Sequence, residues 1–259
     1  MKKISFGETL KAGLPILLIA CTLKVHASTQ YTWSASSGLL PNQVDARMTL
    51  NDTANPENPV LENGILALAT SANEELLGYV QSGNDIDIPD QLKIEFDLRV
   101  GAGSIASTST GTVSPRTWAS VVFLTATGTG NAAFFSQDKI FVLAQGDRLG
   151  VSTTAFDTND AFHSYKILVS GKSAGSVISI FQDNSLVLTS SVFSGDPFGG
   201  GSPRIVWGDQ TFAAQGLSEW KSFVHNASAV PEPAVLLTML LGLSVVLRSS
   251  AVQTKSTEA

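Results

Sequence analysis

The segment 92–100 constrains the fold more than any other part of the sequence. It reads LKIEFDLRV, so apolar residues alternate strictly with charged ones. Successive side chains of a β-strand point to opposite faces, and this pattern therefore predicts a strand with one buried and one solvated face. The charges on the solvated face also alternate in sign, which favours pairing with charges on neighbouring strands. The segment predicts a sheet that turns one face to the core.

Shorter runs elsewhere show a similar mixture of apolar and polar residues. They predict strands at 65–69, 119–124, 139–144, 164–169, 177–181, 186–190 and 204–207. The residues 182–185 predict a hairpin turn, because Asp and Asn tolerate its left-handed backbone. Segments 101–115 and 195–203 predict loops of small residues, and nothing between the two chain ends has a helical period. Short strands separated by turns predict an all-β fold, an antiparallel two-sheet sandwich or jelly roll.

The N-terminal residues 1–27 have the layout of an export signal. Three lysines precede a short apolar core, and Val25, His26 and Ala27 occupy the positions that a signal peptidase reads. We therefore expect signal peptidase to cleave after Ala27 and leave Ser28 as the mature N-terminus. An alternative stays open, because residues 18–21 resemble a lipobox, which would make Cys21 a lipidated N-terminus.

The C-terminal residues 229–259 form a second segment that we expect to lie outside the folded domain. Val230, Pro231, Glu232 and Pro233 precede an uncharged, mostly apolar run at 234–247, and Arg248 follows it. A run of about 14 residues is short of the ~20 that a helix needs to cross a bilayer core. The other interpretation is a buried helix or strand of the domain, although an apolar character all round and the preceding Pro-x-Pro break argue against it.

This tripartite tail resembles the PEP-CTERM sorting signal of Gram-negative bacteria. The resemblance implies recognition by an exosortase, at least transient contact with the inner membrane, and delivery to the cell surface or extracellular matrix. Members of the family usually end in a cluster of arginines close to the terminus. This chain has only Arg248 followed by the eleven-residue tail 249–259, which weakens the expected stop signal.

Composition bounds the remaining segment, 28–228, which we expect to form one domain. About 200 residues are enough for a substantial core. The only cysteine of the chain is Cys21, so this segment cannot form a disulfide. Acidic residues outnumber basic ones about two to one there, and no run of lysines or arginines occurs. These features argue against nucleic acid as a partner.

The order of several segments resembles the concanavalin A-like lectin and glucanase fold, nearest its laminin-G-like branch. The resemblance covers about residues 31–225 and rests on segments 63–68, 93–100, 162–167, 180–184, 204–209 and 218–220. It implies a jelly-roll sandwich and favours extracellular carbohydrate as the ligand class. Its motifs are mostly structural, so they indicate the fold more specifically than an activity.

Glu95 and Asp97 are the first residues to consider for catalysis. The resemblance to retaining glucanases of this fold implies a Glu-x-Asp-x-x-Glu strand, whose carboxylates flank the scissile bond. Here the third position is Val100, and Arg99 stands close enough to pair with Asp97. We therefore expect a solvated strand face and no enzyme activity, with a glycoside-active enzyme that has a degenerate site as the alternative.

Three oxygen-bearing residues in one loop are the candidates for a metal site. Asp157, Asn159 and Asp160 carry the hard oxygen ligands that calcium prefers. The competing interpretation, which we favour, is a turn in which Asp and Asn bond their own backbone. We expect His163 to lie on a strand face, with its ring hydrogen-bonded to a neighbouring residue. We expect no cofactor, with calcium possible at this loop, and the three histidines of the chain indicate no zinc site.

Tryptophans near strand ends are the candidates for ligand binding. Sugars stack on aromatic faces while Asp, Asn and Gln hold their hydroxyls. The candidate ligand-binding residues on this ground are Trp118, Trp207, Asp209 and Trp220. The alternative is that these large rings fill the core of the sandwich. The sequence as a whole predicts an exported, noncatalytic module that binds extracellular polysaccharide or has a structural role.

Overall fold

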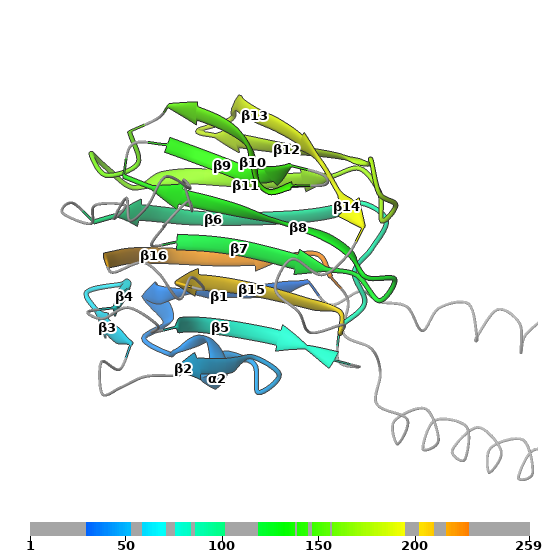
Figure 1. Cartoon of the computed structure of the whole chain (residues 1–259). Coiled ribbons are helices and arrows are strands. Elements are labelled where there is room, and N and C mark those ends of the chain that lie inside the picture. The colour runs from blue at the N-terminus through cyan, green and yellow to red at the C-terminus, as the bar shows by residue number, and fades with distance from the viewer. Residues whose placement is uncertain are drawn as a thin grey trace, which may run out of the picture.

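The computed structural model describes residues 30–52, 59–70, 76–83, 86–101, 119–137, 139–144, 147–155, 157–194, 202–209 and 216–227. Two antiparallel β-sheets pack face to face, and the strands of both run nearly across the view in Figure 1. The expected all-β, two-sheet antiparallel sandwich is confirmed. The segments 1–27 and 229–259, and Trp118, lie outside the described residues.

The first sheet, called sheet A, contains both ends of the described chain. Its order is β13 (Ser185–Ser191), β12 (Val177–Gln182), β11 (His163–Val169), β6 (Leu92–Val100), β16 (Gly216–His225), β4 (Ile65–Thr70) and β3 (Val60–Glu62). The strand β1 (Tyr31–Ser34) pairs with β16 beyond the end of β4. The strand β16 therefore has β6 along one side and two successive partners along the other.

The second sheet, called sheet B, covers the inner face of sheet A. Its order is β10 (Asp147–Ala155), β9 (Lys139–Ala144), β8 (Thr129–Ser136), β7 (Ala119–Leu124), β15 (Arg204–Asp209), β5 (Leu77–Ser82) and β2 (Thr49–Asp52), and β14 (Phe193–Ser194) pairs with β8. The helices of the described residues are the short η1 (Ala35–Ser37) and α2 (Pro41–Val44). Within that part of the chain, no helix has the length and apolar character needed to span a membrane.

The strand β6 and the hairpin after β12 follow the sequence prediction closely. The five apolar side chains of β6 point inward and are at most 2% exposed, while its four charged side chains point outward. Asp183 and Asn184 join β12 to β13 with positive φ angles of 49° and 68°. Both residue types tolerate this left-handed backbone, which a two-residue hairpin turn requires. The hairpin prediction is confirmed.

Aromatic side chains fill the middle of the space between the sheets. Trp207 of β15 stacks on Phe223 of β16, with ring centroids 4.7 Å apart and planes 10° from parallel. Trp220, Tyr79 and Trp33 surround Trp207 at centroid distances of 4.9, 5.1 and 5.5 Å. Because Trp207 and Trp220 come from opposite sheets, their contact fastens the two layers together.

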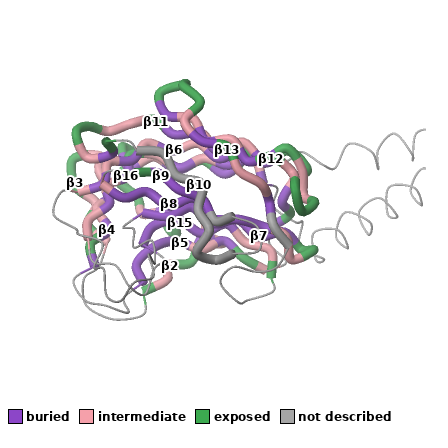
Figure 2. The backbone as a smooth tube through the Cα atoms, turned by 45° about the horizontal axis from the view of Figure 1, so that its top comes forward, coloured by how far each residue is buried: buried purple, intermediate pink, exposed green. Residues whose placement is uncertain are grey.

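Sheet B is buried on its outer face as well as on its inner one. The outward side chains of Val122, Ala132, Phe134, Phe141 and Val206 are at most 6% exposed, and the rings of Phe134 and Phe141 stack 5.0 Å apart. Figure 2 accordingly shows long buried stretches along this sheet. Strands buried on both faces do not alternate in polarity. In β8, whose sequence is TGNAAFFS, Gly130 and Asn131 also interrupt the apolar run, and the segment gave no strand signal.

Candidate functional site

The outer face of sheet A holds the main polar network of the described residues. Its side chains come from three neighbouring strands, β11, β6 and β16, and from the segment just before β11. We call this surface the polar face; it consists of Glu95, Asp97, Arg99, Phe162, Ser164, Lys166, Glu219, Lys221 and Ser222. The alternation of β6 produces it directly, because the residues between the buried ones must point away from sheet B.

Asp97 lies at the centre of the polar face and binds a serine on each side. Ser164 of β11 and Ser222 of β16 are its direct cross-strand partners. The Ser164 hydroxyl donates to Asp97 Oδ1 at 2.6 Å, and the Ser222 hydroxyl donates to Oδ2 at 2.8 Å. The expected pairing of Arg99 with Asp97 is therefore wrong, because serines on both adjacent strands occupy its carboxylate.

Arg99 pairs across the sheet with Glu219. The two residues are direct partners in the register of β6 and β16, and Arg99 Nε donates to Glu219 Oε2 at 2.6 Å. This hydrogen bond raises the pKa of Arg99 further above its ordinary value. Glu95 is held by Lys93 at 2.8 Å on the same strand. Three carboxylates thus share this face, and each of them already has a partner.

Phe162 supplies a partly exposed aromatic ring beside this network. The Arg99 guanidinium carbon lies 4.9 Å from its centroid, and Lys221 Nζ lies 4.0 Å from it. Phe181 of β12 has a similar position under Lys166, at 4.6 Å. All other Phe, Tyr and Trp rings whose side chains the structure describes are buried. Phe162 and Phe181 are therefore the aromatic surfaces that a ligand could reach in this part of the chain.

His163 bridges two carboxylates at the start of β11. Its Nδ1 lies 2.6 Å from Asp183 Oδ2, and its Nε2 lies 2.8 Å from Asp160 Oδ1. Asp183 also accepts the backbone N–H of Ser164 at 3.0 Å, which connects this cluster to the Asp97 network. Burial lowers the pKa of His163, but the hydrogen bonds from its ring to Asp160 and Asp183 outweigh burial and raise it. The prediction that His163 bonds a neighbour is confirmed.

The His163 cluster predicts a pH-dependent contribution to stability. Because the pKa of His163 is raised on folding, its contribution is complete below about pH 6.5 and is lost as pH rises through the folded pKa. The pKa values of Asp160 and Asp183 are lowered, so their contribution is complete above about pH 4 and is lost at lower pH. We expect His163→Gln to lower the urea midpoint most between these limits and progressively less toward pH 8.

The other described histidine, His225, does not contribute to the difference in urea midpoint between the wild type and His163→Gln. Burial lowers the pKa of His225 to about 4, and it titrates alike in the wild type and in the His163→Gln variant. The difference between their midpoints therefore isolates the His163 cluster. A difference that stays constant from pH 5 to pH 8 would contradict the assignment.

The calcium-candidate loop has the geometry of a turn. The backbone N–H of Asn159 donates to Asp157 Oδ1 at 3.1 Å, and Asp160 is engaged by His163 at 2.8 Å. Between them Thr158 is fully buried and links the two sheets. Its carbonyl oxygen accepts the N–H of Val100 in β6, and its hydroxyl donates to the carbonyl oxygen of Ser136 in β8. Within the described ranges, no group of three His, Cys, Asp or Glu side chains is placed to hold a metal ion. The bond from the Asn159 N–H to Asp157 is the local side-chain-to-backbone contact that the turn interpretation expects.

The candidate sugar-binding residues Trp207, Asp209 and Trp220 lie inside the sandwich. Both tryptophans are 0% exposed, and Asp209 is 1% exposed with its Oδ2 accepting from the Thr70 hydroxyl at 2.6 Å. The structure therefore corrects their interpretation as a binding surface, because strand alternation points them at the opposite sheet. These residues belong to the core instead.

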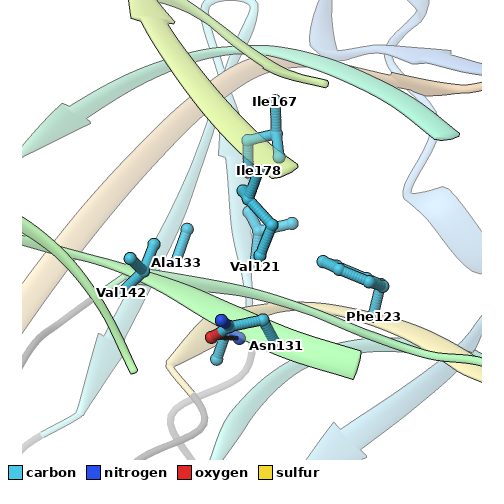
Figure 3. A pocket seen from close by; sticks show the side chains of 8 residues that line it. Val121, Phe123, Asn131, Ala133, Val142, Ile167 and Ile178 are labelled. Carbon is cyan, nitrogen blue, oxygen red and sulfur yellow. Dashed lines mark hydrogen bonds between the residues drawn. The ribbon is translucent and has the colours of Figure 1, made fainter. Parts of the chain in front are cut away.

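A narrow space between the sheets is also part of the core. Ile167 and Ile178 of sheet A face Val121, Phe123 and Val142 of sheet B across it, as Figure 3 shows. The space is too small for a water molecule. Asn131, whose amide nitrogen donates to the Ser191 carbonyl at 2.8 Å, adds the polar group at its edge. It has no room for a ligand.

Sequence reasoning missed six members of the polar face, Phe162, Ser164, Lys166, Glu219, Lys221 and Ser222. One local signal could have indicated the last two. The buried aromatic residues Trp220 and Phe223 are three positions apart, whereas a regular strand would place them two or four apart. This spacing marks a β-bulge, which turns both intervening residues outward. No comparable signal pointed to Phe162.

No protein-family model and no curated protein matches the sequence. Several solved structures resemble the chain at low identity. A protein of unknown function from Shewanella oneidensis MR-1 is 12% identical, with a TM-score of 0.49 over 89% of this chain and 97% of that one. Peanut lectin in complex with a nine-residue peptide is 7% identical, with a TM-score of 0.49 over 79% and 99%. Lectin I-B4 from Griffonia simplicifolia, in its metal-free form, is 14% identical, with a TM-score of 0.44 over 78% and 100%.

Proposed function

We propose that this protein is an exported, noncatalytic module that binds extracellular carbohydrate through the polar face of sheet A. The observation that carries the proposal is the position of Phe162 beside the Asp97, Ser164 and Ser222 network. An aromatic ring next to carboxylate and hydroxyl groups is the combination that holds a sugar by its face and its hydroxyls. A structural role in the cell envelope is the remaining outcome if no ligand binds.

The arrangement of charges favours binding over catalysis. A retaining glycosidase needs one carboxyl group to attack and another to protonate, about 5–5.5 Å apart. On the polar face Glu219 is bound by Arg99 and Asp97 by two serines, so each of these carboxylates already has hydrogen-bond partners within the face. We therefore infer that the protein has no glycosidase activity.

A glycoside-active enzyme is the alternative, and one observation favours it. Glu219 of β16 adds a third carboxylate to the face that carries Glu95 and Asp97, although Val100 stands at the third position of β6. Release of reducing sugar from a polysaccharide panel, abolished by Glu95→Gln, would establish this alternative. No turnover across the panel would support the noncatalytic assignment.

Export is proposed on the two terminal segments. A signal peptide at 1–27 and a PEP-CTERM-like tail at 229–259 would deliver the domain to the cell surface or matrix through signal peptidase and an exosortase. Mass spectrometry of the protein from its own cells tests both processing steps. We expect an N-terminus at Ser28 and a C-terminus near Pro233; an intact chain in the cytoplasm would contradict export.

Replacing Phe162 with alanine tests the proposed binding surface. We expect Phe162→Ala to weaken binding to the best ligand of a glycan array about tenfold, because loss of ring stacking removes about 1.4 kcal/mol. Phe181→Ala is the matched control, since this ring lies on the same sheet under a single lysine. Titration calorimetry measures both variants. Equal losses in the two variants would contradict the placement of the site at Phe162.

A further inference from the structure

We propose that the sugar bound at Phe162 is an acidic one, and that Arg99 and Lys221 bind its carboxylate. This inference rests on the proposed carbohydrate binding and adds the chemical class of the ligand. Two cations approach one aromatic ring here, with Arg99 Cζ at 4.9 Å and Lys221 Nζ at 4.0 Å from its centroid. The other accessible ring, Phe181, has one cation over it among the described residues, Lys166.

A break in the strand pairing places Lys221 over the ring. On one side, pairing with β4 ends at Trp220, and pairing with β1 begins at Ser222. On the other side, the register with β6 shifts between the same two residues. Lys221 thus has no partner on either neighbouring strand and forms a β-bulge. Bulges re-aim side chains and often lie beside binding sites. This one turns both Lys221 and Ser222 toward the polar face.

The two cations retain unused hydrogen-bond donors. Arg99 uses Nε for Glu219, which leaves its two terminal nitrogens without an acceptor among the described residues. In the same part of the chain, the contact of Lys221 Nζ is the Phe162 ring, and no carboxylate pairs with it. Glu219 pairs with Arg99, and Asp97 on the same face binds two serines, so the donors left free near the ring among the described residues are those of Arg99 and Lys221. Such a site fits an anion that arrives with the sugar.

A carboxylate on a sugar ring satisfies these groups together. The planar guanidinium of arginine matches a carboxylate through parallel hydrogen bonds, and lysine adds a point charge. The sugar ring would lie beside Phe162 and its two cations, and its hydroxyls would donate to lone pairs that remain on Asp97 and Ser222. The ligand class is therefore a uronic-acid polysaccharide, in which every such sugar carries one carboxylate.

Esterification of the carboxylate provides a direct test with the full chain. We would measure binding to polygalacturonate, alginate and hyaluronan, each compared with its methyl-esterified form, which has the same backbone without the charge. We expect at least one acid to bind about tenfold more tightly than its ester, the range of one charge-assisted hydrogen bond. Lys221→Met should remove most of that preference, whereas the matched control Lys166→Met should retain it.

The outcomes separate this inference from the proposed function. Binding of neutral glycans with no preference for any acid over its ester would overturn the inference and leave carbohydrate binding intact. A preference for the acid over its ester that survives Lys221→Met and Arg99→Met would also overturn the inference, because other residues would then bind the carboxylate. Absence of binding to every glycan would contradict the proposed function itself. Unchanged thermal unfolding of Lys221→Met confirms that a lost preference is not misfolding.

Discussion

Replacing Trp207 with alanine should lower the free energy of unfolding by about 3–5 kcal/mol, the largest effect expected of any single change described here. Trp207 is 0% exposed and contacts aromatic rings of both sheets, with four ring centroids within 5.5 Å. Truncation removes those contacts and leaves a cavity at the centre of the sandwich, where neighbouring rings are too rigid to collapse into it. Urea unfolding followed by fluorescence measures the loss.

A second substitution at this position separates ring packing from the polar nitrogen. Trp207 Nε1 is buried and has no hydrogen-bond partner among the described residues. Trp207→Phe keeps a ring and removes this unsatisfied donor, so we expect it to cost about half as much as the alanine variant. Leu186→Ala, at a side chain that is 57% exposed, is the surface control and should change stability by under about 0.5 kcal/mol. A loss below about 1 kcal/mol for Trp207→Ala would contradict its central role.

Replacing Gly208 with alanine should cost about 3 kcal/mol, the second largest effect. Gly208 has a φ of 113°, which L-residues rarely adopt, and it lies beside Gly78 of β5. An added Cβ would meet Gly78 Cα at 2.6 Å and the Leu77 carbonyl oxygen at 2.7 Å. Both atoms belong to the backbone, so relief of the clash would require β15 and β5 to separate. Thermal and urea unfolding measure the effect.

Gly38 provides the matched control for Gly208. It also has a positive φ, 72°, but an added Cβ would have no atom within 4 Å. Gly38→Ala should therefore show the conformational penalty alone, about 1 kcal/mol. The difference between the two variants measures the close approach of β15 and β5. Equal losses would show that backbone strain alone accounts for Gly208.

The strands that the sequence predicted best are those with a clear alternation or an unbroken run of apolar residues. The bounds predicted for β6, β7 and β9 are the ones observed, and the turn after β12 has the expected left-handed residues. Strands β5 and β8 were not predicted: β8 is buried on both faces, and β5 contains inward Gln81 and outward Val80, which break the polarity pattern. The local signal disappears where small or polar residues interrupt both the alternation and the apolar run, as Gly130 and Asn131 do in β8 and Gly78 and Gln81 do in β5.

The candidate site was predicted only in part, because its contacts join residues far apart in the chain. The outward direction of Asp97 and Arg99 follows from β6 alone. Their partners, Ser164, Ser222 and Glu219, depend on the register of two other strands, which local patterns do not specify when several strands are similar in length. For this reason the expected Arg99–Asp97 pair was wrong, although both residues were placed on the correct face.

The sequence by itself determined the all-β class, the two faces of β6 and the Asp183–Asn184 turn, because alternation and turn chemistry act between neighbours in the chain. Only the tertiary structure decided which aromatic rings face the solvent. Trp207 and Trp220 entered the core and Phe162 remained at the surface beside Lys221. That outcome depends on which strands become neighbours and on the β16 bulge, and both are set by the packing of the two sheets.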